Sequence, residues 1–471
     1  MVAYTVNDRL EFKHLTGALV VEVPHVTRDI VLDYIMVRSS TSPLSGTGTV
    51  DVRAENPQVV FESDTTHTVV MYFDRCPVTI ANSESPKSIM IPIAPTTGND
   101  HKFIVTVCAH SHYTPLEFFF FNKESNAGNL MRNEVAVAPV PVDKFTSTDI
   151  PLVGSGTPAS PYLIQNKGDY KNFLYFISNN LFGANGDWYR LVNDIDFWGD
   201  TITAVTEQYG FYGKFNGNEH LLTNVFVQGS TYSNKIYISL FPAMTGGRVE
   251  NLSISNVHLI APQNGRCSDV FVGGMTSSVK SYSNGVTLQN IQVSNISFGI
   301  SVNYTVSSMV AIGGIVGRLI ENQGVIGSLL MKSCLFMQPS VKTFSNLADG
   351  SNNLCLGGLI GDINGADVSL EDCMVGFGGN QSDAGTEIIT NCDDSFVGAA
   401  IGRASYNTTQ MVNSLILGGN IQFTGANNSN VKRVMGSHQI VDGTSVINSS
   451  NFYLWKRNNT GNTYTVVWDD F

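Results

Sequence analysis

The stretch "CLGGLIGDING", residues Cys355 to Gly365, places two glycines before an aliphatic pair and a third glycine after it. The pattern also occurs as "GGMTS" at Gly273, "GGIVG" at Gly313 and "GAAIG" at Gly398, so that successive copies follow at intervals of 40, 44 and 41 residues. Looser copies, "SLFPA" and "RVMGS", precede and follow the series. A motif that recurs at a nearly constant interval indicates a repeat architecture.

A second landmark keeps step with the glycines. It occurs in "VENLSI", "LQNIQV", "MKSCLF", "LEDCMV", "MVNSLI" and "VINSSN", and it places at equivalent positions Asn251, Asn290, Ser333, Asp372, Asn413 and Asn448. The residues that follow these are Leu252, Ile291, Cys334, Cys373, Ser414 and Ser449. Two landmarks in step over six copies predict a stack in which equivalent side chains form ladders.

An interval near 40 residues is compatible with propellers, helical solenoids and β-solenoids. The units lack the amphipathic segments of helical repeats, and each shows two strong apolar segments rather than the four strands of a propeller blade. The sequence therefore predicts a right-handed parallel β-helix with two coils of roughly 20 residues per unit. In such a fold glycine leaves room for neighbouring coils and permits bends between sheets.

The rest of the chain divides into a β-rich region and a connecting segment. Runs of strand-forming residues recur from Leu15 to Phe121 with turn signals between them, which predicts a β-sandwich over residues 1–142. Residues 143–158 are rich in Pro, Ser, Thr and Gly and are expected to be a linker. The β-helix is expected to occupy residues 159–471, so the whole chain is predicted to be mainly β.

One amphipathic helix is expected at residues 169–178. Its apolar stripe has the spacing i, i+3, i+4 and i+7 and consists of Tyr170, Phe173, Leu174 and Ile177. Asn166 or Asp169 can cap its first turn by accepting from free backbone N–H groups. This helix is expected to cover the end of the β-helix, where strand edges would otherwise be unpaired.

Composition restricts the possible partners. Only 14% of the 471 residues are charged and the net charge is −12, which argues against nucleic acid as a partner. No apolar run is long enough for a transmembrane helix, and the start "MVAYTVNDRL" lacks the features of a signal peptide. Either the protein is cytosolic or its export segment was removed. The cysteines lack the spacing of a zinc site or a disulfide scaffold and are expected to be mostly buried thiols.

Two groups of side chains could form metal or acid–base sites. On one face of the segment "FIVTVCAHSH", opposite a core face formed by Phe103, Val105, Val107 and Ala109, lie Cys108, His110 and His112. These three could ligate zinc, but histidines on an outward strand face are usually just solvated. In "NDIDFWGD", Asp194, Asp196 and Asp200 could bind calcium or cleave sugars, although a structural use is expected.

Phosphate binding by "GGLIGDING" is not expected. A phosphate-binding loop needs a following Lys and Ser/Thr at the start of a helix, whereas Asp362 would repel an anion and the next segment, "ADVSLEDCMV", is predicted to be a strand. A polysaccharide-degrading β-helix enzyme would need clustered charges across several coils. None of the basic residues between 250 and 450 recurs at a stacked position beside a carboxylate: Arg266, Lys280, Arg318, Lys332, Lys342, Arg403, Lys432 and Arg433.

Aromatic residues gather near both ends of the repeat region. Near its start are Trp188, Tyr189, Phe197 and Trp198, and near its end are Tyr453 and Trp455. They could stack on sugars or form a patch for a protein partner. The alternative is that they close the ends of the core.

The segment "GSGTPASPYLIQN", followed by "LVNDIDFWGD", "FYGKFNGNEHLLTNVFV", "GGIVG" and "GGLIG", resembles the GLUG-motif β-helix proteins over about residues 154–455. The chain departs from that pattern at Ala243, Ser277 and Ala399, where the better copies have glycine, so irregular first and last coils are expected. The N-terminal segments "GALVVEV", "PLSGTGTVDV" and "IPIAPTT" resemble the fimbrillin-like sandwiches of Bacteroidetes surface and pilus proteins.

These resemblances imply an extracellular, outer-membrane-associated protein with a possible lipid anchor outside this chain, and they supply no catalytic residue. We therefore expect a non-enzymatic adhesin that binds an extracellular carbohydrate or protein. The alternatives are a carbohydrate-active β-helix enzyme, either lyase or hydrolase, and a pilus component. No catalytic residue, cofactor or metal ligand is assigned.

Overall fold

The computed structural model describes residues 2–6, 9–83, 85–96, 102–114, 117–125, 128–179, 186–262, 265–280, 285–299, 304–321, 327–338, 343–347, 353–377, 386–390, 394–398, 400–405, 408–412, 415–417, 421–424, 430–432, 435–439, 446–450, 455–457 and 464–466. The chain is mainly β, as its composition predicted, and it forms two compact units, residues 1–153 and 154–471. Across the described residues, no helix combines the length and the apolar character that crossing a bilayer requires.

Two sheets of unit 1 share one apolar core. The larger contains, in order, β13 (Thr146–Thr148), β11 (Phe118–Ser125), β10 (Phe103–Ser111), β4 (Ile30–Ser39) and β7 (Thr68–Tyr72), with β8 (Thr79–Ile80) beside β4. The smaller contains β12 (Val135–Pro139), β3 (Gly17–Val23) and β9 (Lys87–Ile93). Two hairpins complete the unit: β1 (Val2–Val6) with β2 (Arg9–Lys13), and β5 (Ser45–Val50) with β6 (Val59–Thr66). The predicted core face of β10 is confirmed, because the buried core includes Phe103, Val105, Val107 and Ala109.

The segment expected to be a linker, residues 143–158, is partly structured. A 3₁₀-helix, η1 (Val142–Lys144), leads to Phe145, which is buried in the core of unit 1. The next residues form β13, which pairs with β11. The boundary between the units falls after Val153. Unit 1 therefore extends beyond residue 142, because Phe145 and β13 complete its core and its sheet.

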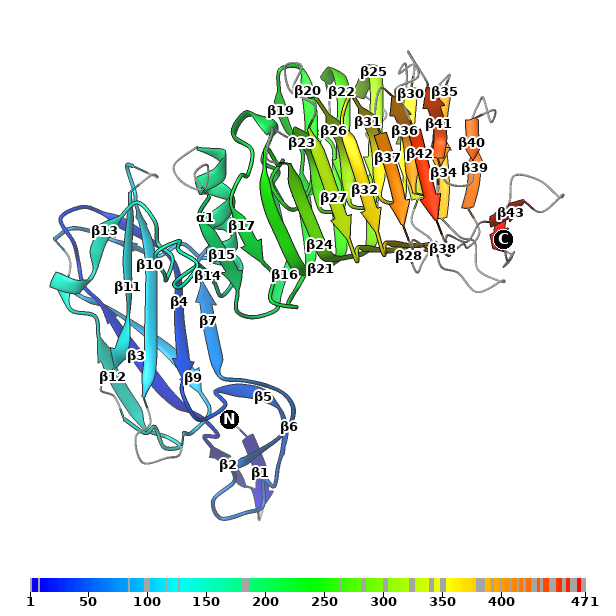
Figure 1. Cartoon of the computed structure of the whole chain (residues 1–471). Coiled ribbons are helices and arrows are strands. Elements are labelled where there is room, and N and C mark those ends of the chain that lie inside the picture. The colour runs from blue at the N-terminus through cyan, green and yellow to red at the C-terminus, as the bar shows by residue number, and fades with distance from the viewer. Residues whose placement is uncertain are drawn as a thin grey trace. The chain divides into compact units, whose positions relative to one another are not determined.

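Unit 2 contains three sheets of parallel strands, apart from the antiparallel β19–β20 pair (Figure 1). The first contains β14 (Tyr162–Ile164), β15 (Trp188–Leu191), β16 (Ile195–Thr203), β17 (Lys214–Asn216), β18 (Leu221–Gln228), β21 (Gly247–Ile260), β24 (Val286–Gly299), β27 (Ser328–Lys332), β28 (Leu335–Gln338), β29 (Thr343–Leu347), β32 (Asp367–Glu371), β33 (Met374–Phe377), β34 (Thr386–Thr390), β37 (Thr408–Val412), β38 (Leu415–Leu417), β39 (Ile421–Thr424) and β42 (Val446–Ser450).

The second sheet contains β19 (Ser230–Tyr232), β20 (Lys235–Ile238), β22 (Gly265–Gly273), β25 (Tyr304–Gly313), β30 (Asn353–Gly357), β35 (Asp394–Gly398) and β40 (Asn430–Lys432). The third contains β23 (Thr276–Lys280), β26 (Val316–Ile320), β31 (Ile360–Asn364), β36 (Ile401–Ser405) and β41 (Met435–Gln439). A separate hairpin joins β43 (Trp455–Arg457) to β44 (Tyr464–Val466).

Each repeat passes once through the three sheets. Gly273 pairs with Gly313, Gly313 with Gly357, and Gly357 with Gly398, so the predicted alignment of these glycines is confirmed. Strands of the third sheet pair at the same intervals, 40 residues from Thr276 to Val316 and 44 from Val316 to Ile360, and in the first sheet Gly247 pairs with Val286, 39 residues further on. The expectation of two coils of roughly 20 residues per unit is therefore wrong, because one pass uses the whole interval of 40 residues between Gly273 and Gly313.

The first copy is irregular, as its departures from the glycine pattern predicted. Ile238 pairs with Val272, 34 residues further on, whereas Phe241 pairs with Thr276, 35 residues further on. The register therefore shifts by one residue at the corner where later copies have glycine. Ala399 lies outside the described residues.

The third glycine of the motif allows the second and third sheets to meet at a sharp corner. A Cβ atom at Gly361 would lie 2.6 Å from the carbonyl oxygen of Gly317 and 2.6 Å from the backbone nitrogen of Ile312. Both contacts are with backbone of neighbouring strands, which cannot move aside as a flexible side chain would. The backbone of the preceding repeat therefore leaves no room for a Cβ at Gly361, although Ser277 occupies the equivalent position of an earlier repeat.

The predicted polar ladder lies where the first sheet bends. Its members Asn251, Asn290, Ser333 and Asp372 all have left-handed φ angles between 52° and 54°. The Asn290 side-chain amide donates to Asn251 Oδ1 at 3.0 Å, and that of Asn251 donates to Asn216 Oδ1 at 3.3 Å. Asparagine suits this position because its backbone tolerates a left-handed φ and its side-chain amide hydrogen-bonds to the amide of the next asparagine in the ladder. Asn413 lies outside the described residues. The prediction for Asn448 is wrong, because Asn448 pairs with Gln410 and not with the ladder position.

A second ladder was not predicted. Asn224, Asn256 and Asn295 also have left-handed φ angles, between 52° and 59°. Asn295 donates to Asn256, and Asn256 donates to Asn224. The sequence carried a signal for it, since Asn256 and Asn295 each follow a member of the first ladder by five residues. The first sheet therefore bends twice in each of these repeats.

Helix α1 (Lys167–Ser178) lies beside the first strands of unit 2, two residues longer at its start than predicted (Figure 1). Both candidate caps act. Asn166 Oδ1 accepts from the backbone nitrogens of Gly168 and Asp169 at 2.8 and 3.2 Å, and Asp169 Oδ2 accepts from Gln165 N at 2.9 Å. This reciprocal arrangement satisfies the free N–H groups on both sides of the helix start.

The apolar stripe of α1 closes the core with a cluster of aromatic rings. Tyr170 and Phe173 project from the helix, and ring centroids within the cluster lie 5.0–6.0 Å apart. The partners on the strands and connecting segments are Tyr189, Phe197, Phe211, Phe215 and Phe241. The prediction that the helix covers the start of the repeat core is confirmed by these contacts.

The glycine corner gives a direct test of stability. Gly361→Ala should lower the free energy of unfolding by about 1–3 kcal/mol, because the added methyl group overlaps fixed backbone. Chemical denaturation of the whole chain measures this change. The control is Gly186→Ala, since no heavy atom lies within 4 Å of an added Cβ there and only the left-handed φ of 89° opposes the substitution. Equal losses in both variants would contradict the close-approach explanation.

Candidate functional site

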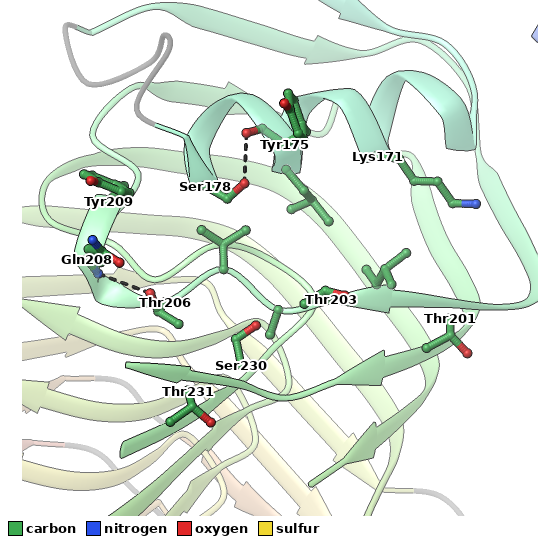
Figure 2. A pocket seen from close by; sticks show the side chains of 14 residues that line it. Lys171, Tyr175, Ser178, Thr201, Thr203, Thr206, Gln208, Tyr209, Ser230 and Thr231 are labelled. Carbon is green, nitrogen blue, oxygen red and sulfur yellow. Dashed lines mark hydrogen bonds between the residues drawn. The ribbon is translucent and has the colours of Figure 1, made fainter. Parts of the chain in front are cut away.

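A pocket of about 490 Å³ lies between α1 and the end of β16 (Figure 2). One wall is the outer face of the helix, and the opposite wall combines β16, the turn after it and the start of β19. Its lining is Lys171, Leu174, Tyr175, Ser178, Thr201, Ile202, Thr203, Ala204, Val205, Thr206, Gln208, Tyr209, Ser230 and Thr231.

The helix contributes its second stripe to the pocket. Lys171, Leu174, Tyr175 and Ser178 have the spacing i, i+3, i+4 and i+7, so they share one face, beside the face that carries the aromatic cluster. Ser178 Oγ donates to the carbonyl oxygen of Tyr175 at 2.9 Å, as Figure 2 shows. The same helix therefore closes the core through Tyr170 and Phe173 and builds a pocket wall with its adjoining face, and Leu174 of the predicted apolar stripe lies on the pocket side.

Strand alternation builds the other wall. In β16 the side chain of Ile202 is buried, whereas Thr201 and Thr203 on either side are exposed. The 3₁₀-helix η2 (Glu207–Tyr209) follows, and Thr206 Oγ1 caps it by accepting from Gln208 N at 3.4 Å. Tyr209, at the end of η2, is 39% exposed. Figure 2 shows Thr206, Gln208 and Tyr209 together on one side of the pocket.

The lining is polar but almost uncharged. Eight of its 14 residues carry a hydroxyl group, Gln208 adds an amide, and Lys171 is its single charged residue. Hydroxyl and amide groups both donate and accept hydrogen bonds, which suits a ligand that is itself rich in hydroxyl groups. No Asp or Glu is among these lining residues, so the pocket lacks the carboxylate pair of a glycoside hydrolase.

The three aspartates of "NDIDFWGD" do not converge on one point. Asp194 Oδ1 lies 2.9 Å from His220 Nδ1 and accepts from Leu221 N at 3.0 Å. Asp196 accepts from Trp198 N at 2.7 Å and from the Asn224 side chain at 2.9 Å. Asp194 and Asp196 share the outer face, as predicted.

Asp200 holds the helix to the first strands. Its Oδ2 lies 2.6 Å from Lys167 Nζ and 3.1 Å from Lys171 Nζ. Burial alone would raise the pKa of Asp200, but the hydrogen bonds from the two lysines outweigh it and hold the pKa well below its usual range. Asp200 is therefore charged at every physiological pH. Its position fixes Lys171 at the edge of the pocket.

Two of the three possible zinc ligands in unit 1, Cys108 and His110, contact the carboxylate of Asp33. His110 Nδ1 lies 2.7 Å from Asp33 Oδ1, and Cys108 Sγ donates to Asp33 Oδ2 at 3.6 Å. The ring of His112 instead packs edge-on against Tyr113. Within the described parts of the chain, no three His, Cys, Asp or Glu side chains lie close enough to hold a metal ion. Cys108 and His110 are thus brought together around Asp33, and His112 is not.

The His110–Asp33 pair predicts a pH effect. The hydrogen bond to Asp33 raises the pKa of His110 above its ordinary 6.5, against an opposing effect of burial. The charged pair therefore contributes its full stability below about pH 6.5 and loses it as the pH rises through the raised pKa. In Asp33→Asn the NMR-measured pKa of His110 should fall. Asp143→Asn, at an exposed carboxylate, should leave it unchanged, and the same pKa in all three proteins would contradict the assignment.

A charged column in the third sheet corrects the sequence analysis, which found no basic residue stacked beside a carboxylate. Arg318, Asp362 and Arg403 pair with one another across β26, β31 and β36. Arg403 Nε donates to Asp362 Oδ1 at 2.7 Å, and Arg318 Nε lies 3.1 Å from Asp362 Oδ2. Lys332 and Glu371 are a second such pair, at 3.4 Å in the first sheet.

The signal for this column was in the sequence. Each member directly follows a motif copy, in "GGIVGR", "GGLIGD" and "GAAIGR". The charges alternate between repeats, so a search for the same residue type at each position misses them. The Asp362 side chain is fully buried, and it is therefore a structural partner of the arginines rather than a group available to a substrate.

Removing the central carboxylate should be costly. Asp362→Asn leaves two arginines without their partner and should lower the free energy of unfolding by about 3–5 kcal/mol. The triple variant Arg318→Met, Asp362→Leu, Arg403→Met should be close to wild type, because it removes all three charges together. The free energy of unfolding of both variants is measured by denaturant titration. A loss in the single variant alone shows that the unpaired arginines, and not lost packing, cause the destabilisation. A triple variant as unstable as the single one would contradict this account.

The aromatic residues near the first strands divide into two groups. Tyr189 and Phe197 are buried in the cluster under α1, in line with the alternative that they close the core. Trp188 is partly exposed with Lys214 Nζ 4.7 Å from its ring centre, and Trp198 is 63% exposed. Tyr453 lies outside the described residues, and of Trp455 only the backbone in β43 is described.

No protein-family model matches the chain, and no curated protein matches it. The pocket's own side chains are therefore the basis for assigning its chemistry. The motif "GGLIGDING" leads into strands β31 and β32 and not into a helix, so the prediction of a following strand is confirmed. The pocket was not predicted from the sequence. The polar stripe of α1 was visible, but its partners at 201–209 and 230–231 could not be placed beside it.

Proposed function

We propose that this chain is a non-enzymatic ligand-binding protein of the cell surface, and that the pocket beside α1 binds a neutral carbohydrate. One observation carries the proposal: the lining combines eight hydroxyl-bearing side chains with a single charged residue and no carboxylate. Sugars offer hydroxyl groups that match this lining and C–H faces that match tyrosine rings. Tyr175 and Tyr209 supply such rings within the pocket.

The architecture that we propose for unit 2, which contains the pocket, is a parallel β-helix. In its support, each repeat passes once through three parallel sheets, and α1 covers the first strands with an aromatic cluster. The two sheets of unit 1 around one core support a β-sandwich. The resemblances to GLUG-motif and fimbrillin-like proteins fit both, and on them rests the proposal of an extracellular, outer-membrane-associated adhesin. We retain no enzymatic or pilus function, because no described contact favours either one.

Binding and degradation can be separated in one experiment. The whole chain should bind neutral glycans on an array and release no reducing ends from them. Tyr209→Ala should weaken binding at least about fivefold, because it removes a partly exposed ring from the pocket. Calorimetry on the best glycan measures the change, and circular dichroism checks the fold.

The matched control is Tyr113→Ala in unit 1, which removes a tyrosine that is 73% exposed and lies outside the pocket. It should bind as wild type does. Release of reducing ends would overturn the non-enzymatic assignment. Equal affinities of wild type and Tyr209→Ala would show that the glycan binds outside this pocket. If the whole chain binds no glycan on the array, carbohydrate is not the ligand.

A further inference from the structure

Two large hydrophobic side chains stand out as exposed among the described residues of unit 2. One is Tyr209, which lines the pocket, and the other is Trp198, at 63%. An exposed tryptophan gives up the burial that ordinarily stabilises a fold. A contiguous exposed apolar patch can mark a binding site, whereas a single exposed side chain is common, so the surroundings of Trp198 decide its meaning.

Trp198 is also held in an unusual backbone conformation. Its φ is 52°, in the left-handed region that bulky residues avoid, and Gly199 follows with φ 74°. Asp196 fixes this turn by accepting from Trp198 N at 2.7 Å, while its other oxygen accepts from Asn224 at 2.9 Å. The pairing of β16 with β18 shifts register between Asp196 and Asp200, which is where the turn projects. Strain combined with exposure favours a role in binding over a role in folding.

The projecting turn adjoins the pocket. Lys167 Nζ lies 5.4 Å from the centre of the Trp198 ring and 2.6 Å from Asp200. The same Asp200 oxygen holds Lys171, which lines the pocket. Thr201, three residues after the tryptophan, also lines the pocket. The ion pairs of Lys167 and Lys171 with Asp200 therefore lie between Trp198 and the pocket.

A second ring extends this surface onto the next strand. Phe226 pairs with Thr201 across β16 and β18 and is partly exposed. One face of its ring is covered by His258, whose ring centroid is 4.7 Å away at an angle of 20°, and Ser297 in turn contacts His258 Nδ1 at 2.6 Å. Toward the other side lies Gly199, where even an added Cβ would stay 3.7 Å from the Phe226 ring. Gly199, the residue after Trp198, therefore lies next to the Phe226 ring.

We propose that Trp198 and Phe226 form a second sugar-binding platform next to the pocket, so that the ligand is an oligosaccharide of at least two sugar units. This inference rests on the proposed carbohydrate-binding function and specifies its ligand. The first sugar occupies the hydroxyl-lined pocket, and the next packs its C–H face on the aromatic platform. Neighbouring strands are about 4.8 Å apart, a step comparable to the length of one sugar unit.

The test uses the glycan that the array identifies, as a ladder of one to six units, with the whole chain and calorimetry. Wild-type affinity should rise about three- to tenfold from one unit to two or three, as expected for one added aromatic contact. Trp198→Ala should bind the single sugar within about twofold of wild type and should lose the increase with length. Trp198→Phe should restore part of the increase. Trp188→Ala, a tryptophan outside this platform, should behave as wild type.

The outcomes separate this inference from the function on which it rests. Wild-type binding that does not change with chain length overturns the platform and leaves the pocket assignment intact. So does a Trp198→Ala variant that loses affinity equally for one sugar and for many. If no glycan on the array binds, both proposals fail together. Retained binding of the single sugar shows that the variant is folded.

Discussion

The close approach of successive repeats at the glycine corner is the constraint on which the structure of unit 2 depends. At Gly361 the backbone of one repeat lies so near to Gly317 and Ile312 that no Cβ fits. The second and third sheets meet at this corner, and the residues on either side of it pair in register from repeat to repeat. Once register is fixed, equivalent residues of every repeat must share the same environment.

Columns of side chains follow from that register. An asparagine at a bend lies next to another asparagine, and the two amides satisfy each other, as in Asn251 and Asn290. A carboxylate that is buried between stacked strands needs cations from the repeats on either side. Asp362 has them in Arg318 and Arg403. Polar ladders and charge alternation are thus two solutions to one problem, the burial of polar groups between stacked strands.

The first strands have no earlier repeat beneath them, and α1 takes that place. Its apolar stripe completes the core, while Lys167 and Lys171 attach the helix to Asp200. The candidate pocket lies at this junction, between α1 and the end of β16. The exposed Trp198 projects from the same junction. Function is therefore proposed where the repeat pattern stops, at the cover and the first strands.

The sequence by itself determined the repeat, its interval, the glycine alignment, the first polar ladder and the helix that covers the core, because each depends on local spacing or on residue type at a fixed period. It did not determine that one repeat makes one pass, since strand bends at left-handed residues leave no clear mark in hydrophobic patterning. It also missed the Arg318–Asp362–Arg403 column and the pocket. The column lies at a position that the glycine alignment already places in register, and its alternating charges hide it from a search for one residue type. The pocket joins α1 to residues 201–209 and 230–231, and only the tertiary structure decides that these segments meet.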